Sequence, residues 1–261
     1  MILEQLAEHA HSRVAAAKRR EPLEALRRRA EALPPSAKIR FCQALAAPGL
    51  SFICEIKRAS PSRGLIVCEF PYLQIAREYQ AAGAAAISVL TEPDFFLGRD
   101  SYLREVAQTV ALPVLRKDFT VDAYQLYEAR LLGASAVLLI CALLDKSALE
   151  EYLILAGQLE LDALVEVRDA AEIQRALAAG AGMIGVNNRN LRDFTVDMQT
   201  SLQLRALIPP EVLFVAESGI HSPADIAHLR QHGTDAVLIG EALMRAEDKA
   251  AFLRELRGGD G

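Results

Sequence analysis

Charged side chains stand at the ends of several apolar segments of this sequence. Glu55 and Lys57 lie two positions apart at the end of "SFICEIK", and Lys117 occupies the same kind of position in "LRKDF". Buried carboxyl and ammonium groups can have pKa values shifted toward neutrality, where they act as general acids and bases. The sequence therefore contains candidates for proton transfer, provided that the fold brings them together.

The period of a β-strand predicts which of these side chains share a face. Because alternate residues of a strand point the same way, Glu55 and Lys57 lie on one face and Cys54 on the other. In later apolar runs the inward-facing series likewise begins with apolar or small residues and ends in polar ones. These polar residues are Lys117, Glu166, Asn187, Arg189 and Glu217. Alone, the Glu55 and Lys57 pair could be a structural ion pair. Three carboxylates and two lysines in one place cost so much desolvation that we interpret them as a functional site.

The elements that must position these residues follow from the alternation of strand-like and helical segments. Helical stretches separate the apolar runs and end in glycines suited to a C-cap, such as Gly83 and Gly133. This alternation is typical of parallel strands joined by crossover helices. Eight evenly spaced units predict a (β/α)₈ TIM barrel better than an open doubly wound sheet. The runs cover residues 51–57, 86–92, 114–119, 136–142, 163–167, 183–189, 213–219 and 236–243.

The segment before the first strand has a helical pattern. Residues 2–20 and 22–33 are amphipathic and are punctuated by Pro22, Pro34 and Pro35. Because this segment has no strands and too little core to stand alone, we expect it to pack on the barrel. We thus predict an N-terminal helical extension over residues 1–47 and a catalytic barrel over residues 48–261.

Two loops near the C-terminus are rich in backbone donors. "ESGIHSPAD" contains Ser218 and Gly219, and "IGEAL" contains Gly240. The loops after strands seven and eight of such barrels commonly bind phosphate through backbone amides and a helix N-terminus. Gly240 alone could serve a tight turn only. Together with Ser60 of the loop after the first strand, Gly219 and Gly240 could form one phosphate cradle.

Composition excludes several classes of partner. The chain has 261 residues, of which 52% are hydrophobic, a net charge of −5, and no basic stripe interleaved with aromatic residues, so nucleic acid is not an expected partner. The longest uncharged stretch, residues 131–144, is shorter than the roughly 20 residues that span a bilayer. We interpret it as a buried strand and expect no membrane partner. Since no secretory signal is visible, we expect a cytoplasmic location.

Neither a metal site nor a disulfide is predicted. His228 and His232 could share a helical face, but no third ligand lies near them and HExxH is absent, so a solvated helix is the favoured interpretation. We expect no metal and no cofactor. The cysteines lack CxxC spacing and are expected to be reduced: Cys42, Cys54, Cys68 and Cys141.

The chain closely resembles the indole-3-glycerol phosphate synthase family from end to end. The resemblance rests on "EIKRASPSRG", "LRKDF", "LLI", "LVEVRD", "IGVNNRNL", "AESGI" and "IGEALM", in family order. It implies a carboxy-lyase of tryptophan biosynthesis that acts on a phosphorylated small molecule. The reaction would be the decarboxylating ring closure and dehydration of 1-(2-carboxyphenylamino)-1-deoxy-D-ribulose 5-phosphate to indole-3-glycerol phosphate, carbon dioxide and water.

The resemblance also implies catalytic roles. Lys117 would be the general acid on the ketone, and Glu166 the acid or base of the dehydration. Glu55 would keep Lys57 and Lys117 charged or act as the final base. Whether Lys57 only holds the anions of the substrate or also donates a proton stays open. Positioning of sugar hydroxyls and developing charges would fall to Asn187, Arg189 and Glu217.

Binding residues are implied in the same way. The phosphate would contact Ser60, Ser218, Gly219 and Gly240, and the aromatic ring would rest against Pro61, Phe96 and Phe119. Glu241 stands where some relatives have serine, which leaves its contact with phosphate to the backbone. The loop residues Val67 to Pro71 and Arg99 also depart from the usual family pattern.

Other interpretations are less consistent with the residues. Resemblance to phosphoribosylanthranilate isomerase, a related phosphate-binding barrel, would imply a cysteine and an aspartate as the acid/base pair. In this sequence Glu55 and Lys57 point inward instead, and Cys54 points outward. A barrel kept for assembly alone would have no reason to retain costly buried charges. We expect a monomer that could dock with other enzymes of the tryptophan pathway.

Overall fold

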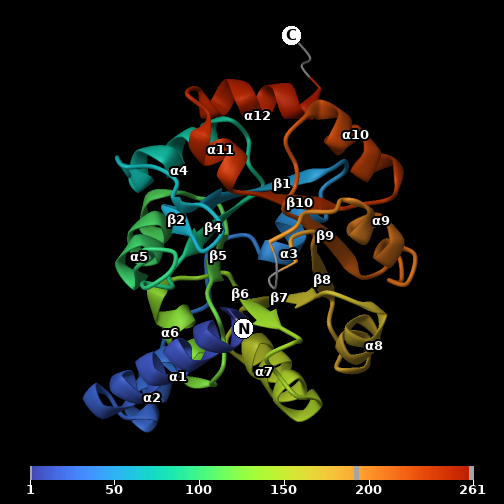
Figure 1. The fold of residues 1–261 in the computed structure, drawn as a ribbon. Coiled ribbons are helices and arrows are strands. Elements are labelled where there is room, and N and C mark those ends of the chain that lie inside the picture. The colour runs from blue at the N-terminus through green and yellow to red at the C-terminus, as the bar shows by residue number, and fades with distance from the viewer. Residues whose placement is uncertain (1, 191–193, 259–261) are drawn as a thin grey trace.

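A closed barrel of parallel strands forms the centre of the molecule. The computed structural model describes residues 2–190 and 194–258. Neighbours around the barrel follow the order β1-β10-β9-β8-β7-β6-β5-β4, and the connecting helices surround it (Figure 1). The predicted (β/α)₈ barrel is confirmed. Its strands are β1 (Ser51–Ile56), β4 (Ala86–Leu90), β5 (Val114–Lys117), β6 (Ala136–Ile140), β7 (Asp162–Val167), β8 (Met183–Asn187), β9 (Leu213–Glu217) and β10 (Ala236–Ile239).

Alternation along the strands separates two hydrophobic cores. Ile53 of β1 belongs to the core inside the barrel, whereas Cys54 and Ile56 belong to the core between barrel and helices. The interior is packed by apolar residues in the lower part of the strands, such as Leu115 and Leu164. Polar groups can therefore gather only at the C-terminal ends of the strands, as the alternation predicted.

The outer helices follow the strands in sequence. Several end at glycines in the left-handed conformation, including Gly83 (φ 80°) and Gly133 (φ 83°), which confirms the predicted C-caps. No helix among the described residues has the length and apolar character that crossing a membrane requires. The helices are α4 (Tyr72–Ala81), α5 (Asp100–Thr109), α6 (Tyr124–Leu132), α7 (Lys146–Gln158), α8 (Ala170–Ala178), α9 (Gln199–Arg205), α10 (Pro223–Gln231), α11 (Glu241–Arg245) and α12 (Lys249–Arg257).

The N-terminal extension contacts both ends of the barrel. Its helices are α1 (Ile2–Arg20), α2 (Leu23–Glu31) and α3 (Phe41–Leu45), and the start of α1 lies beside β6 and β7 in Figure 1. The short helix α3 was not predicted. Its Phe41 and Leu45 are buried in the interior core, and the amide of Cys42 donates to Asp162 at the start of β7 (2.9 Å). The extension thus covers the C-terminal mouth with α1 and closes the opposite end with α3.

Two local features differ from the sequence-based expectation. A small hairpin, β2 (Ala59–Ser60) and β3 (Gly64–Leu65), follows β1 where only a loop was expected. The sixth predicted strand reached Arg189, but β8 ends at Asn187. The Asn187 side-chain oxygen accepts a hydrogen bond from the Arg189 amide (3.0 Å), which turns the chain away from the strand.

The four cysteines form no disulfide among the described residues. All four lie within the described residues, and Cys54 and Cys141 are buried. Burial raises the pKa of the Cys54 thiol to about 12, so it remains protonated at neutral pH. Cys54 packs in the outer core, away from the barrel interior.

Candidate active site

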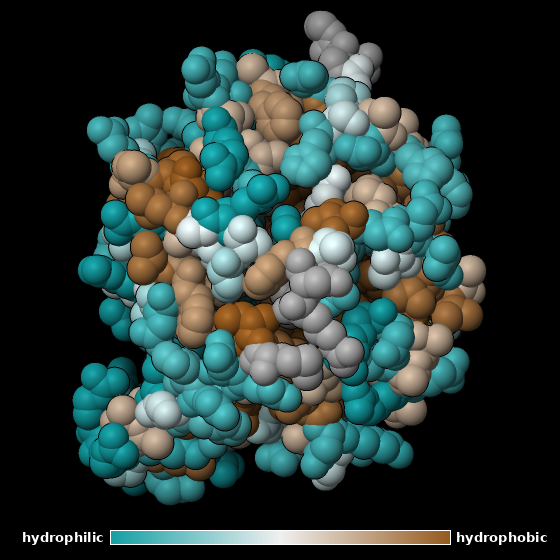
Figure 2. Space-filling model, in the orientation of Figure 1, coloured by the Kyte–Doolittle hydropathy of each residue, from teal (hydrophilic) through white to brown (hydrophobic). Residues whose placement is uncertain are grey.

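A cavity at the C-terminal ends of the strands contains every residue that the sequence proposed for the site. It lies under the start of α1, and Figure 2 shows this face, where hydrophobic side chains near the centre adjoin hydrophilic ones. The residues come from many strands and loops, as expected for the C-terminal end of a barrel. The proposed members that line it are Glu55, Lys57, Ser60, Pro61, Phe96, Lys117, Phe119, Glu166, Asn187, Arg189, Glu217, Ser218, Gly219, Gly240 and Glu241.

A chain of alternating charges crosses the floor of this cavity. Lys57 Nζ lies 2.7 Å from Glu55 Oε1, and Lys117 Nζ lies 3.8 Å from Glu55 Oε2. On its other side Lys117 Nζ contacts Glu217 Oε2 at 2.9 Å. Glu55 also accepts a hydrogen bond from Ser88 (3.3 Å), its register partner on β4. Each lysine is thereby held by carboxylates in a place from which bulk water is largely excluded.

Two glycines make room for the carboxylates. A Cβ atom on Gly185 would lie 2.4 Å from Glu217 Oε1, and a Cβ on Gly240 would lie 2.4 Å from Glu55 Oε1. Neither glycine has a positive φ, so close approach explains the absence of a side chain. Sequence analysis assigned Gly240 to a phosphate loop, and the structure adds its contact with Glu55.

Glu166 is placed to exchange protons near neutral pH. Burial raises its pKa to about 7, and the charge of Glu217 acts in the same direction. The charge of Lys117 and a hydrogen bond from Asn187 oppose this rise. Because the carboxyl is close to half ionised at pH 7, it can serve as an acid or a base in different steps.

Lys117 and Glu55 are held in their charged forms. Burial lowers the pKa of Lys117, but the carboxylates of Glu217, Glu55 and Glu166 outweigh it and keep the pKa well above its usual value. Burial likewise raises the pKa of Glu55, yet Lys57 and Lys117 reverse the direction and lower it. At neutral pH the cavity therefore contains a protonated Lys117 beside an ionised Glu55.

One oxygen of Glu217 points to a possible ligand contact. Within the described part of the chain, Glu217 Oε1 is buried and has no hydrogen-bond partner, while Oε2 pairs with Lys117. A buried unsatisfied carboxylate oxygen is costly unless a ligand or water completes its bonding. Since Glu217 lines the cavity, this oxygen can accept a hydrogen bond from a hydroxyl group bound there.

Apolar residues form one wall of the cavity. The rings of Phe96 and Phe119 lie 6.1 Å apart between centroids, at an angle of 40°. Ile2 and Leu6 of α1 also line the cavity, and sequence analysis did not assign them to the site. Their spacing of four within an amphipathic helix indicated burial, but not against which surface. The wall offers an apolar resting place for a flat aromatic group.

Small residues surround the opposite end of the cavity. Ser60 lies in the β2–β3 hairpin, and Ser218 and Gly219 follow β9 with φ values of 67° and 81°. A Cβ on Gly219 would lie 2.7 Å from Val196 Cγ1, so this position demands glycine for space as well as for its conformation. Backbone and hydroxyl donors there, beside Gly240, suit an anion.

Arg189 and Glu241 lie at this small-residue end. Arg189 lies in the loop after β8, with its Nη2 atom 3.7 Å from Glu241 Oε2 and Nη1 donating to the Phe194 carbonyl (3.3 Å). Glu241 begins α11 and has side-chain partners in three arginines, Arg63, Arg189 and Arg245. Sequence analysis identified neither Arg63 nor the role of the Glu241 carboxylate, since these residues are distant along the chain.

A buried network behind Lys117 connects the site to α1. Asp118 accepts hydrogen bonds from both terminal nitrogens of Arg13 (3.1 and 2.6 Å) and from Thr91 (2.5 Å). These partners lower the pKa of Asp118 in spite of its burial. Nothing in the sequence pattern linked Arg13 to "LRKDF", because α1 has no fixed register relative to β5.

The unusual loop residues lie outside the cavity. Arg99 is exposed and its guanidinium lies over the ring of Tyr102, 5.8 Å from the centroid. Val67 and Phe70 pack against the outer core. None of the three lines the cavity.

The histidines considered as metal ligands occupy a helix surface. His232 Nδ1 lies 2.8 Å from the His228 carbonyl oxygen, and both residues are exposed. Across the described residues, no group of three His, Cys, Asp or Glu side chains is arranged to hold a metal ion.

Sequence comparison identifies relatives along the whole chain. The family model described as indole-3-glycerol phosphate synthase matches residues 3–256. An indole-3-glycerol phosphate synthase from Ruminiclostridium cellulolyticum is 52% identical over 258 residues, with 99% of each chain covered. The protein of the same name from Lactiplantibacillus plantarum is 51% identical over 259 residues, again with 99% of each chain covered.

Solved structures share the barrel at low sequence identity. A 3-hexulose-6-phosphate synthase from Salmonella typhimurium has a TM-score of 0.65 at 15% identity and covers 79% of this chain and 96% of its own. A thiamine phosphate pyrophosphorylase from Pyrococcus furiosus has a TM-score of 0.56 at 19% identity and covers 80% of this chain and 93% of its own. These likenesses concern the fold alone.

Proposed function

Because the chain belongs to the indole-3-glycerol phosphate synthase family, its reaction is the decarboxylating ring closure of that family, and we propose that the cavity under α1 performs it. The substrate is 1-(2-carboxyphenylamino)-1-deoxy-D-ribulose 5-phosphate. The observation that carries the proposal is the placement of a buried, protonated Lys117 in the same cavity as Glu166, whose pKa is about 7. One group is set to donate a proton and the other to exchange one.

Lys117 acts in the first step. The aromatic carbon that bears the carboxylate attacks the ketone carbon, and the ketone oxygen takes a proton from the Lys117 ammonium. An alkoxide is a far stronger base than an amine, so donation becomes favourable as the new carbon–carbon bond forms, even though the pKa of Lys117 is raised. Carbon dioxide then leaves, and its bonding electrons restore the aromatic ring.

Glu166 acts in the dehydration. The hydroxyl made in the first step leaves as water after taking a proton from an acid, and the neighbouring carbon loses a proton to a base. A carboxyl with a pKa of about 7 can fill either part. Glu55, which lies within 4 Å of both lysines, helps to keep Lys117 charged and is the second candidate base.

Substrate binding uses the two ends of the cavity. The aromatic ring rests against Phe96, Phe119 and Pro61, while the phosphate takes donors from Ser60, Ser218, Gly219 and Gly240, with Lys57 nearby. Glu217 Oε1, which has no protein partner among the described residues, accepts from a sugar hydroxyl. Asn187 lines the cavity with them, and Arg189 stands with Glu241 at the phosphate end.

We further propose that the enzyme works as a monomer in the cytoplasm. The unpaired cysteines suit a reducing compartment. Residues 1–47 are proposed to be an extension of the catalytic domain, because Arg13 and Cys42 bond to barrel residues. We also propose that the enzyme docks with other enzymes of the tryptophan pathway. Light scattering with and without those enzymes tests both the monomer and the docking.

Turnover of the substrate tests the function directly. Purified protein is given the carboxyphenylamino-deoxyribulose phosphate, and indole fluorescence and carbon dioxide release are followed together. We expect the two products in equal amounts. A folded sample that forms no indole would overturn the proposed function, and carbon dioxide release without indole would place the failure in the dehydration.

A further inference from the structure

The carboxylate of Glu241 gathers arginines from separate segments at the small-residue end of the cavity. Its Oε1 atom lies 3.0 Å from Arg63 Nε and 3.4 Å from Arg245 Nε, and its Oε2 atom lies 3.7 Å from Arg189 Nη2. Glu241 and Arg189 line the cavity. Arg245 is on the same helix as Glu241, four residues along, and does not line the cavity.

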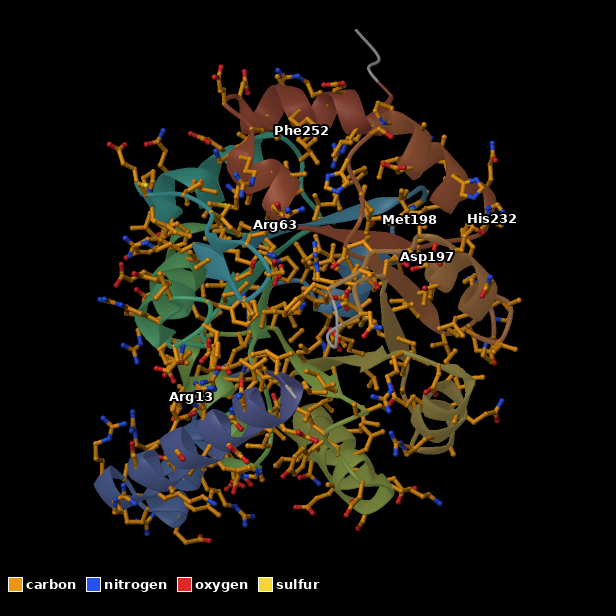
Figure 3. The ribbon with its side chains drawn as sticks, in the orientation of Figure 1. Arg13, Arg63, Asp197, Met198, His232 and Phe252 are labelled. Atoms are coloured by element: carbon orange, nitrogen blue, oxygen red, sulfur yellow. The ribbon has the colours of Figure 1, made fainter. Side chains whose placement is uncertain are left out.

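Arg63 reaches this carboxylate from the turn of the β2–β3 hairpin. The Arg63 amide donates to the Ser60 carbonyl (3.3 Å), so Arg63 and the cavity residue Ser60 belong to the same turn. Figure 3 shows Arg63 between the hairpin and α11, at the mouth of the barrel. Its side chain is 52% exposed, and within the described ranges Glu241 is its only ion-pair partner.

The charge balance at this end favours an anion despite the glutamate. Arg63 and Arg189 carry two positive charges against the single negative charge of Glu241, and a phosphate monoester carries about −1.5 to −2 at pH 7. A lone carboxylate in the wall would repel such a group. With its oxygens engaged by guanidinium groups, Glu241 instead fixes where the positive charges lie.

The geometry of arginine lets one side chain serve both anions. Arg63 contacts Glu241 through Nε, and no described residue forms an ion pair with its terminal nitrogens. A guanidinium can bind a second anion through these donors. We propose that Arg63 binds the phosphate of the substrate and that Glu241 is the positioning residue that holds Arg63 over the phosphate end of the cavity. This inference rests on the proposed function, since it assigns the phosphate of that substrate.

Substitution of Arg63 tests the contact. For Arg63→Gln we expect KM to rise about 5- to 30-fold and kcat to change less than about threefold, because the phosphate is remote from the reacting carbons. Binding of inorganic phosphate, titrated by calorimetry, should weaken by a similar factor, whereas binding of indole glycerol without phosphate should not change. Arg245→Gln is the matched control: it removes another arginine from the same carboxylate and should leave KM within about twofold.

A double-mutant cycle tests the positioning role. Glu241→Ala should raise KM several-fold in the parent protein and have little further effect when Arg63 is already glutamine. Equal effects in both backgrounds, or a lower KM for Glu241→Ala alone, would show that Glu241 acts independently of Arg63 and overturn its role.

The outcomes separate this inference from the proposed function. If the parent protein forms product while Arg63→Gln has a normal KM, or loses affinity equally for phosphate and for indole glycerol, the inference is wrong and the function stands. If the parent forms no product but binds phosphate with the expected dependence on Arg63, only the proposed function fails. If the parent neither forms product nor binds phosphate, both fail.

Discussion

Lys117 Nζ and Glu217 Oε2 form an ion pair, 2.9 Å long, that spans the interior of the barrel from β5 to β9. The two strands lie on opposite sides of the ring in the barrel order. Beneath the pair the interior is apolar, with Leu115, Leu164 and Val215 all fully buried. The pair therefore marks the floor of the cavity, and any ligand that pairs with Lys117 must compete with Glu217.

Removal of the Lys117 ammonium tests its place in the first step. Lys117→Ala should lower kcat by at least about 100-fold and change KM much less, because protonation of the ketone oxygen is an interaction of the transition state. Steady-state kinetics of indole formation measure both constants. Lys18→Met, which removes a surface lysine paired with Asp122, is the control and should have normal kinetics. A turnover number close to that of the parent in Lys117→Ala would reject the assignment.

The pH dependence of the rate tests Glu166. Its pKa is raised to about 7, so the ionised base is depleted as the pH falls through that value, and a rate that needs the base should then fall about tenfold per pH unit. We expect an acid limb near pH 7 in kcat/KM, which reports ionisation of the free enzyme. In Glu166→Gln the rate should be lower throughout and this limb should disappear. An unchanged limb in the variant would assign the titration to another group.

A single methyl group at Gly185 should disturb the floor of the cavity. The Cβ of Gly185→Ala would lie 2.4 Å from Glu217 Oε1 and 3.1 Å from Leu164 Cδ1, so the Glu217 carboxylate must move away from Lys117. We expect kcat to fall at least about tenfold, with a loss of stability of about 1 to 3 kcal/mol from overpacking.

Gly182→Ala is the matched control for this experiment. Gly182 is exposed, precedes the same strand, and has no atom within 4 Å of its added Cβ. Its kinetics and urea midpoint should resemble those of the parent. Normal kinetics in Gly185→Ala would mean that Glu217 can shift without consequence, which contradicts the role given to the pair.

The contact between α1 and the barrel should contribute to both stability and binding. Arg13→Gln removes the hydrogen-bonded guanidinium partner of Asp118, whose side chain is only 1% exposed and keeps Arg116 at 3.8 Å, and should cost roughly 2 kcal/mol of unfolding free energy. Because Leu6 of the same helix lines the cavity, KM should rise as well. Urea unfolding and steady-state kinetics measure the two effects. Arg27→Gln breaks an exposed pair on α2 and should leave the urea midpoint close to that of the parent. An equal loss of stability in both variants would contradict the role given to Arg13.

Much of the site was predictable because it depends on local periodicity. Period two turns Glu55 inward and Cys54 outward, and the barrel rule then places the ends of all strands at one mouth. Arg189 shows where this reasoning stops. It lines the cavity as expected, but from a loop, since the Asn187 side chain bonds to its amide and ends the strand.

Contacts between elements without a shared register were not predictable. The amphipathic pattern of α1 indicated a buried face, yet only the structure shows that Leu6 covers the mouth and that Arg13 bonds to Asp118. The short helix α3 has too few residues to show a helical period, and its burial depends on the opening at the base of the barrel. The pairing of Arg63 with Glu241 similarly depends on the hairpin after β1, which no pattern indicated.

The sequence by itself determined the barrel, the inward-facing residues at its C-terminal end and the family, because strand alternation and motif order are properties of the linear chain. Only the tertiary structure decided which carboxylate pairs with Lys117, how far burial raises the pKa of Glu166, and which arginines surround Glu241. Distances and burial are set by the closure of the barrel and the packing of α1 and α11 over it. These depend on contacts between residues far apart along the chain, and the properties that control proton transfer depend on them in turn.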